Sequence, residues 1–390
     1  MKNIILLGLT SLLADFSSEM IQPLMPFFII SLGGAGIAVG LIGGTGDALA
    51  AVFKVFSGRL ADQSKKYKKF VYFGYGFSAI SKFLFPLAAT WSHILILRPI
   101  ERIGKGLRDA PRDAIISESN GGTAEKRGFG FGVQRAMDSV GAIIGSIVAY
   151  ILFVNLGVSF RYIFLIAAII ALTALIPIFF VKEPRSLTER KINHKKFSFK
   201  NLSPQLKRFI LTATVFNFAN FNFMFFILKA GEVFKDIGGI GLPILLYIFF
   251  SVFDASLSAP AGRLSDKIGR QPVLTIGYLL FAVTSFGFIF ADSLFALMGL
   301  FALYGAFRAF IDASQRAFVS DLSPIEDRAV SLGIFEMSIG LALIPAGLIA
   351  GFLWNIDPAY TFVYGSGLSL IALAAFLLTV KSSRVQGLSH

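Results

Sequence analysis

Two carboxylates near the start of the chain lie in an otherwise apolar stretch, where charged side chains are costly. Asp15, Glu19 and Gln22 are spaced i, i+4 and i+7, so a helix presents all three on one face. Such carboxylates suit the uptake of a proton on one side of a membrane and its release on the other. The alternative is that they pair with buried basic residues and only join helices. Asp47, within GGTGDALA, is a third candidate for proton coupling.

A second set of charges is basic and follows one face of a later apolar stretch. Its members, at near-helical spacing, are Arg98, Arg102, Lys105 and Arg112. Cations inside a membrane need anions, which are either protein carboxylates such as Asp15 and Glu19 or an acidic substrate. We predict that Arg102 and Lys105, together with Gln22, contact the substrate.

Four charges nearer the expected cytoplasmic side indicate a gate. Arg112 and Asp113 are adjacent, and Arg135 and Asp138 lie one helical turn apart in the next apolar stretch. We expect them to form a salt-bridge cluster with a structural or gating role.

The second half of the chain places amides among aromatic residues. In FNFANFNFMFF, Asn217 and Asn220 lie about one turn apart. Aromatic walls with a few amides are typical of small-molecule pockets, but lipid-facing phenylalanines with asparagines that join helices give the same pattern. Arg308 and Asp312, at i and i+4, are predicted to contact the substrate or each other.

The elements that position these residues are predicted from hydropathy. Of the 390 residues, 55% are hydrophobic and 15% are charged, with a mean hydropathy of +0.73, whereas soluble domains carry about 25% charged residues. Long apolar runs predict twelve membrane spans, near residues 4–30, 37–57, 70–90, 94–117, 129–153, 159–181, 208–229, 240–260, 273–291, 294–319, 329–353 and 360–380. The first begins like a signal peptide, but apolar residues resume after Asp15, so we expect it to be retained.

Basic residues divide and orient the chain. We predict six-helix bundles at 1–182 and 208–381, a cytoplasmic linker at 183–207 and a cytoplasmic tail at 382–390. Lys and Arg gather in alternate loops, in the linker and in the tail, so the positive-inside rule places both termini in the cytoplasm. The expected location is the cytoplasmic (inner) membrane. The net charge of +13 therefore reflects topology, and nucleic acid is not an expected partner.

The two halves of the chain resemble each other. GRLADQSKKYKK at 58 returns as GRLSDKIGRQPV at 262, and RDAPRDAIISES at 108 aligns with FIDASQRAFVSDLS at 310. The offset stays between 201 and 204 residues. A duplicated set of six spans is typical of transporters whose halves rock about a central site.

These motifs resemble the major facilitator superfamily over essentially the whole chain. The family's G-x-L-a-D-x-x-G-R/K-R/K loop is matched by Gly262, Leu264, Asp266, Gly269 and Arg270. The first copy keeps Gly58 and Asp62 but has Lys65 in place of the second glycine. The resemblance implies an all-α membrane protein with twelve transmembrane helices in two pseudo-symmetric six-helix bundles.

The duplicated loop also predicts a gate on the cytoplasmic side. Its aspartates can face the positive end of a neighbouring helix or pair with an arginine of the same loop. We therefore assign gating to Gly58, Asp62, Gly262, Asp266 and Arg270. The alternative is a tight basic turn that only obeys the positive-inside rule.

Two further segments refine the resemblance. RIGKG looks like the superfamily's R-x-x-Q-G pattern with Lys105 in place of Gln, and together with DFSSEM it resembles a bacterial and archaeal permease subgroup that implies no single substrate. The proline-containing pattern of drug/proton antiporters is missing from VGAIIGSIVA, which weakens an antiporter assignment.

Other functional classes find little support in the sequence. It has no Cys, its three His lie in expected loops, linker or tail, and H-E-x-x-H, G-x-S-x-G and phosphate-loop patterns are absent. We therefore expect no enzyme activity, metal or cofactor. We predict a monomeric secondary transporter that moves a small organic solute by alternating access, coupled to protons and directed to efflux. Alternatives are an uptake permease, a lipid translocator, or a transport-inactive sensor or assembly partner.

Overall fold

The computed structural model describes residues 1–119, 124–184, 187, 199, 202–235, 239–324 and 327–379, without the side chains of 124–128 and 313. Every regular element in these residues is helical. The predicted tail at 382–390 and most of the predicted linker lie outside the described residues. The chain forms two compact units, Met1–His194 with Asn222–Ile248, and Lys195–Phe221 with Phe249–His390.

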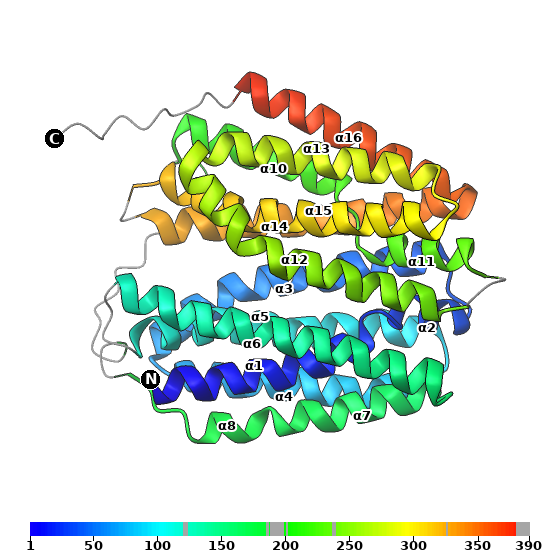
Figure 1. Cartoon of the computed structure of the whole chain (residues 1–390). Helices are drawn as coiled ribbons and strands as arrows, with labels where there is room; N and C mark the ends of the chain where they lie inside the picture. The colour runs from blue at the N-terminus through cyan, green and yellow to red at the C-terminus, as the bar shows by residue number, and fades with distance from the viewer. Residues whose placement is uncertain are drawn as a thin grey trace. The chain divides into compact units, whose positions relative to one another are not determined.

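The first unit holds the helices of the first sequence repeat (Figure 1). They are α1 (Lys2–Ile21), α2 (Met25–Ser31), α3 (Gly36–Ser64), α4 (Tyr67–Leu84) with η1 (Phe85–Leu87), α5 (Trp91–Glu118), α6 (Ala124–Tyr150) with η2 (Ile151–Asn155), α7 (Phe160–Thr173) and α8 (Leu175–Phe179). The unit also includes α11 (Met224–Val233) and the start of α12 (Gly241–Ile268). α1 packs against α6 and α7, and α11 contacts α2 and α3.

The first unit has a loop end at which three segments meet. The Asn3 side chain donates hydrogen bonds to Ser119 Oγ (3.0 Å) and to the Lys182 carbonyl (2.7 Å). At the opposite end, Arg161 donates to the carbonyls of Pro86 and Ala88, both at 3.0 Å. α1 therefore begins at the loop end and α4 ends at the opposite end, whereas α5, and α7 with α8, run back to the loop end.

The second unit holds the remaining helices: α10 (Pro204–Ala219), the rest of α12, α13 (Arg270–Ile289), α14 (Leu294–Asp321), α15 (Arg328–Ile356) and α16 (Pro358–Thr379). α13 packs against α14 and α16, and α10 packs against α15 and α16. Aromatic rings fill its core, with Phe216 stacked on Tyr278 at 4.0 Å between ring centroids. The repeat is visible in element bounds, since α5 and α14 are both 28 residues long.

Eleven spans in the described residues are long and apolar enough to cross a membrane. The twelfth predicted span corresponds to α5, which is long enough but carries the charges of ERIGKGLRDAPRD. α5 buries much of this charge by packing against both α3 and α4. Gly74 of α4 and Gly104 of α5 permit this contact, because a Cβ at Gly104 would lie 2.6 Å from the Gly74 carbonyl oxygen. The twelve-helix fold is therefore confirmed.

Candidate functional site

A buried charge cluster on α5 forms the centre of the candidate site. Arg98, Glu101 and Arg102 are only 3%, 1% and 8% exposed. The Glu101 carboxylate lies 3.1 Å from the Arg98 guanidinium and 3.7 Å from that of Arg102, and it accepts a hydrogen bond from Ser78 Oγ at 3.0 Å. One carboxylate of α5 therefore faces two arginines, so the arginines need further anionic or polar partners from outside this helix.

Two residues outside α5, Gln22 at the end of α1 and Asp47 of α3, complete this cluster. Gln22 Oε1 accepts hydrogen bonds from Arg98 (2.7 Å) and Arg102 (3.3 Å). The Asp47 carboxylate of α3 lies 3.7 Å from Arg102 Nε and accepts a hydrogen bond from the Asn222 amide at 2.8 Å. The structure thus brings Gln22, Asp47 and Arg102 together. Asp47 and Glu101 are the carboxylates in contact with Arg102.

Glu19 and Asp15 share a face of α1 but have different surroundings. Glu19 Oε2 accepts a hydrogen bond from the Tyr247 hydroxyl at 2.6 Å, within the first unit. Asp15 is half-buried, and no hydrogen bond or ion pair reaches it from the described residues. It interacts electrostatically with Glu19 and with Asp138 of α6.

Lys105 differs from the arginines of α5 because its charge is uncompensated at close range. The side chain is half-buried, and in the described part of the chain no acceptor lies within hydrogen-bond or ion-pair distance of its ammonium group. It interacts electrostatically with Glu19 and Asp109. Arg102 and Lys105 thus have different surroundings, since Arg102 is tied into the cluster and Lys105 is not.

The predicted gating charges of the first unit lie toward the loop end of α5. Arg112 pairs with Asp113 at 2.9 Å and with Asp109 at 3.7 Å, and it donates a hydrogen bond to Ser11 at 3.3 Å. Asp138 accepts a hydrogen bond from Gln134 at 2.9 Å and interacts electrostatically with Arg112. Arg135 lies on the same helix, one turn before Asp138.

The duplicated loop differs between the two units in its backbone. Gly269 has φ +93° and ψ +161°, a conformation that only glycine adopts readily. Lys65, at the matching position, has φ +58° and ψ +24°, a left-handed conformation that other residues reach at moderate cost. The missing glycine of the first copy is therefore replaced by a left-handed lysine.

The side chains of this loop also pair differently in the two copies. Asp266 pairs with Arg270 at 2.6 Å, and Arg270 also contacts Asp321 at 3.1 Å, which ties the loop to the end of α14. Asp62 instead accepts a hydrogen bond from the Tyr67 hydroxyl at 2.7 Å. Gly58 faces α5, where an added Cβ would lie 3.2 Å from Ala110 Cβ, whereas no atom lies within 4 Å of such a Cβ at Gly262.

The predicted substrate residues of the second repeat are scattered. Asn217 is 6% exposed and donates to the Ala213 carbonyl of its own helix at 2.8 Å, and Asn220 ends α10. Phe216 and Phe221 of this stretch are buried in the second unit rather than facing lipid. Arg308 and Asp312 pair at 3.3 Å, with side chains 42% and 43% exposed.

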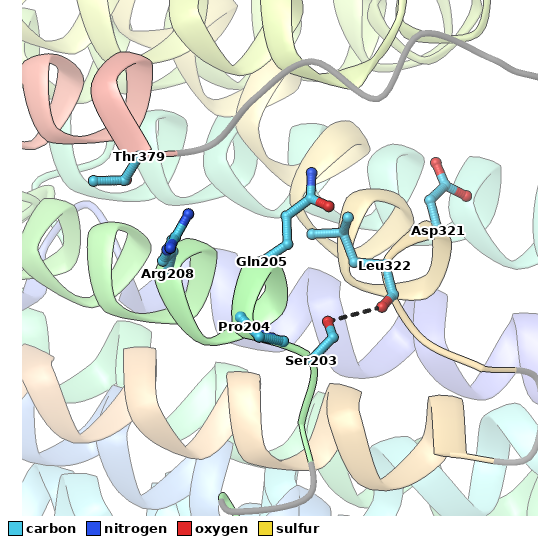
Figure 2. A pocket seen from close by; sticks show the side chains of 7 residues that line it. All are labelled: Ser203, Pro204, Gln205, Arg208, Asp321, Leu322 and Thr379. Carbon is cyan, nitrogen blue, oxygen red and sulfur yellow. Dashed lines mark hydrogen bonds between the residues drawn. The ribbon is translucent and has the colours of Figure 1, made fainter.

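A cavity of about 550 Å³ opens at the helix ends of the second unit (Figure 2). It is lined by residues at the start of α10 and the ends of α14 and α16, including Arg208, Asp321 and Thr379. Ser203 caps α10 and also donates to the Leu322 carbonyl at 3.5 Å. None of the predicted substrate residues lines this cavity. In the described part of the chain no three His, Asp or Glu side chains gather as a metal site.

Several residues of the site were not predicted from the sequence. Glu101 was visible as a charge three residues after Arg98, but not as the partner of two arginines. Lys82 is 1% exposed and donates to Ser17 and Ser18, both at 2.9 Å. Asn222 and Tyr247 carry no local signal, because their partners Asp47 and Glu19 lie 175 and 228 residues away.

Comparisons with known proteins establish the family. The model of the Major Facilitator Superfamily matches residues 7–235 and 209–389. The chain belongs to this superfamily. It is 46% identical over 374 residues to an uncharacterised MFS-type transporter of Methanocaldococcus jannaschii, covering 95% of this chain and 93% of that protein. It is therefore a multi-pass membrane transporter of small molecules, a class distinct from enzymes.

Two other comparisons add detail. Multidrug resistance protein 1 of Bacillus subtilis is 30% identical over 132 residues, 34% of each chain. The crystal structure of the nucleoside transporter NupG has a TM-score of 0.82 at 15% identity, covering 98% of this chain and all of that one. This structural likeness shows the shared fold.

Proposed function

We propose that this transporter exchanges protons for an anionic, partly apolar organic solute and works in the direction of efflux. The observation that carries the proposal is a pair of hydrogen bonds within the first unit, Tyr247 to Glu19 and Asn222 to Asp47. In each, a carboxylate of the first repeat accepts from a residue of the second repeat.

Protonation gives these carboxylates a way to act on the fold. Hydrogen bonds to an ionised carboxylate are roughly twice as strong as those between neutral groups. A proton on Glu19 or Asp47 therefore weakens the contact with Tyr247 or Asn222. Proton binding then alters the attachment of the segment 222–248 to α1 and α3, which is the coupling that an exchanger requires.

The charge of α5 supports an anionic substrate. Glu101 and Asp47 balance the charges of Arg98 and Arg102. The positive charge left in this part of α5 is that of Lys105, which has no hydrogen-bond or ion-pair partner among the described residues. A substrate carboxylate near Lys105 would neutralise this charge. We assign Gln22, Arg102 and Lys105 to this end of the substrate, and Asn217, Asn220, Arg308 and Asp312 to the contribution of the second repeat.

Efflux is favoured by the partial similarity to Multidrug resistance protein 1. Uptake by proton symport is the second candidate, and it uses the same carboxylates with the opposite flux. We assign gating to two groups of residues. The first is Arg112 and Asp113 near the end of α5, with Arg135 and Asp138 in the middle of α6. The second is Asp62, Asp266 and Arg270 of the duplicated loop.

Transport into vesicles tests the proposal. Protein reconstituted in liposomes is screened with labelled organic acids, amphipathic drugs and neutral metabolites, with a pH gradient in either direction. We expect an organic anion to cross the membrane in the direction opposite to the flow of protons. Movement in the same direction as protons would establish uptake, and no dependence of any flux on the gradient would contradict proton coupling.

Variants assign the roles within the same vesicles. Asp15→Asn and Glu19→Gln should abolish gradient-driven flux, while Asp292→Asn, an exposed carboxylate outside the spans, should leave it unchanged. Lys105→Gln should raise KM about tenfold or more for an anion, since hydrogen bonds to charged groups contribute roughly 1.5–3 kcal/mol. An unchanged KM would contradict the anionic substrate site.

A further inference from the structure

The first unit has a cavity of about 450 Å³ that the transport function does not use. It lies between the start of α4 and the end of α8, and we call it the α4–α8 pocket. Three lysines, Lys66, Lys68 and Lys69, line it together with the aromatic rings of Tyr72, Phe73 and Phe179. It therefore combines a cationic part with an apolar floor.

Lys68 connects the two helices between which the pocket lies. Its backbone N–H donates to Glu183 Oε1 at 2.8 Å, and its ammonium group donates to the Phe179 carbonyl at 2.8 Å. These two bonds attach the end of α8 to the start of α4. The Lys68 ammonium is thereby held at the Phe179 carbonyl, and one oxygen of the Glu183 carboxylate is held by a backbone N–H.

The other two lysines of the pocket present positive charge at the surface. Lys66 and Lys69 are exposed, and among the residues that the structure describes neither ammonium group has a hydrogen bond or an ion pair. The Glu183 carboxylate accepts a hydrogen bond from the Lys68 backbone N–H, and the three lysines that line the pocket outnumber this one carboxylate. Two neighbouring ammonium groups at the mouth of an apolar pocket suit a phosphate group.

The apolar lining of the pocket is aromatic and partly exposed. Tyr72 and Phe179 meet edge to face with their centroids 5.2 Å apart. Phe73 and Phe179 are nevertheless 57% and 60% exposed. Aromatic rings with lysines at the end of a span are typical of the membrane–water interface.

An apolar track leads from this pocket along the bundle. Phe73, Phe77, Ile80 and Leu84 are 57%, 48%, 61% and 40% exposed and share one face of α4. α4 packs against α7 and α8, whose Ile169 and Ile176 are 52% and 57% exposed. From Phe73 to Leu84 the helix rises roughly 16 Å, close to the half-thickness of a bilayer's hydrocarbon core, about 15 Å.

We propose that the α4–α8 pocket binds an anionic phospholipid, whose phosphate contacts Lys66 and Lys69 and whose hydrocarbon chain follows the exposed face of α4. A soluble phosphate compound would match the lysines but leave the aromatic floor and the track without a partner. A zwitterionic lipid would match the track but bring its own cation near the lysines. The inference is independent of the direction and coupling of transport.

Lipid titration of the purified, delipidated full chain tests this site. Binding of phosphatidylglycerol and of phosphatidylcholine with the same acyl chains is measured by native mass spectrometry. Each basic residue near an anionic lipid contributes about fivefold in affinity. Lys66→Gln with Lys69→Gln should therefore lower phosphatidylglycerol affinity about 25-fold and leave phosphatidylcholine binding unchanged.

The matched control removes two charges from the corresponding loop of the second repeat. Arg263→Gln with Lys267→Gln should change phosphatidylglycerol affinity by less than about threefold, because each charge outside the site acts only through screened, long-range attraction. Equal losses in the two double variants would show general basic attraction and overturn the proposal. Unchanged phosphatidylglycerol affinity in the Lys66 and Lys69 variant would overturn it as well.

Two further arms separate a lipid from a soluble anion. Phe73→Ala should weaken both lipids, since it removes part of the floor and the start of the track. Glycerol phosphate and inorganic phosphate at millimolar concentration should not displace phosphatidylglycerol. Displacement by either compound, together with full binding to the Phe73 variant, would identify the pocket as a site for soluble anions.

Discussion

Glu101 is a buried carboxylate that compensates two arginines of the first unit. It is 1% exposed and lies against the guanidinium groups of Arg98 and Arg102. We predict that Glu101→Gln lowers the free energy of unfolding by about 3 kcal/mol or more, because it leaves two buried cations with less compensation. Thermal unfolding in detergent measures this change.

Asp113→Asn is the control for Glu101→Gln. The Asp113 side chain is 38% exposed, and its partner Arg112 keeps Asp109 as a second carboxylate. Because Asp113 is partly exposed and Arg112 keeps a second carboxylate, loss of this pair is expected to cost about 1 kcal/mol. Equal melting temperatures for the two variants would show that Glu101 does not hold the cluster together.

The same residues show what spacing along a sequence reveals and what it does not. The helical face shared by Asp15, Glu19 and Gln22 follows from spacing alone. The partner of each charge depends on how helices pack, so Asp47 and Glu101, rather than Asp15 or Glu19, contact Arg102 directly. The contact of Asn222 with Asp47 cannot be predicted from spacing for the same reason, since only the folded chain brings the two residues together.

At the scale of elements, the fit of α4 against α5 is set by small residues. A Cβ at Gly74 would lie 2.7 Å from the Gly104 carbonyl oxygen and 2.8 Å from the Arg108 backbone nitrogen. Gly74→Ala should therefore separate the two helices and cost about 1–3 kcal/mol. The result is checked by thermal unfolding and by loss of transport.

Gly76 provides a control on the same helix. No atom lies within 4 Å of a Cβ added at Gly76. Gly76→Ala should be neutral or slightly stabilising, since alanine favours helix by up to about 1 kcal/mol. A Gly74 variant as stable as the Gly76 variant would contradict the close packing of α4 on α5.

Hydropathy predicts the positions of the helices well, because burial and membrane insertion require apolar residues along the whole length of a segment. α5 was expected at 94–117 and spans Trp91–Glu118, although its charges set it apart from the other spans. The break between α10 and α11 was not expected, because FNFANFNFMFF is continuously apolar and aromatic except for its amides. At this break the Asn222 side chain donates to Asp47 and accepts from the Met224 backbone N–H, and hydropathy records neither contact.

At the scale of the whole molecule, the two repeats carry their basic loops at corresponding positions, Lys65–Lys69 and Lys267–Arg270. If these loops are cytoplasmic, the turns that contain Thr90 and Asp292 face outward, because one span separates each from its basic loop. The chain has no native Cys, so single cysteines report the side of each loop without background. We predict that Lys66→Cys and Lys267→Cys are protected from a membrane-impermeant maleimide in intact cells and labelled in inverted vesicles. Thr90→Cys and Asp292→Cys should show the opposite pattern, and labelling of Lys66→Cys in intact cells would contradict cytoplasmic termini.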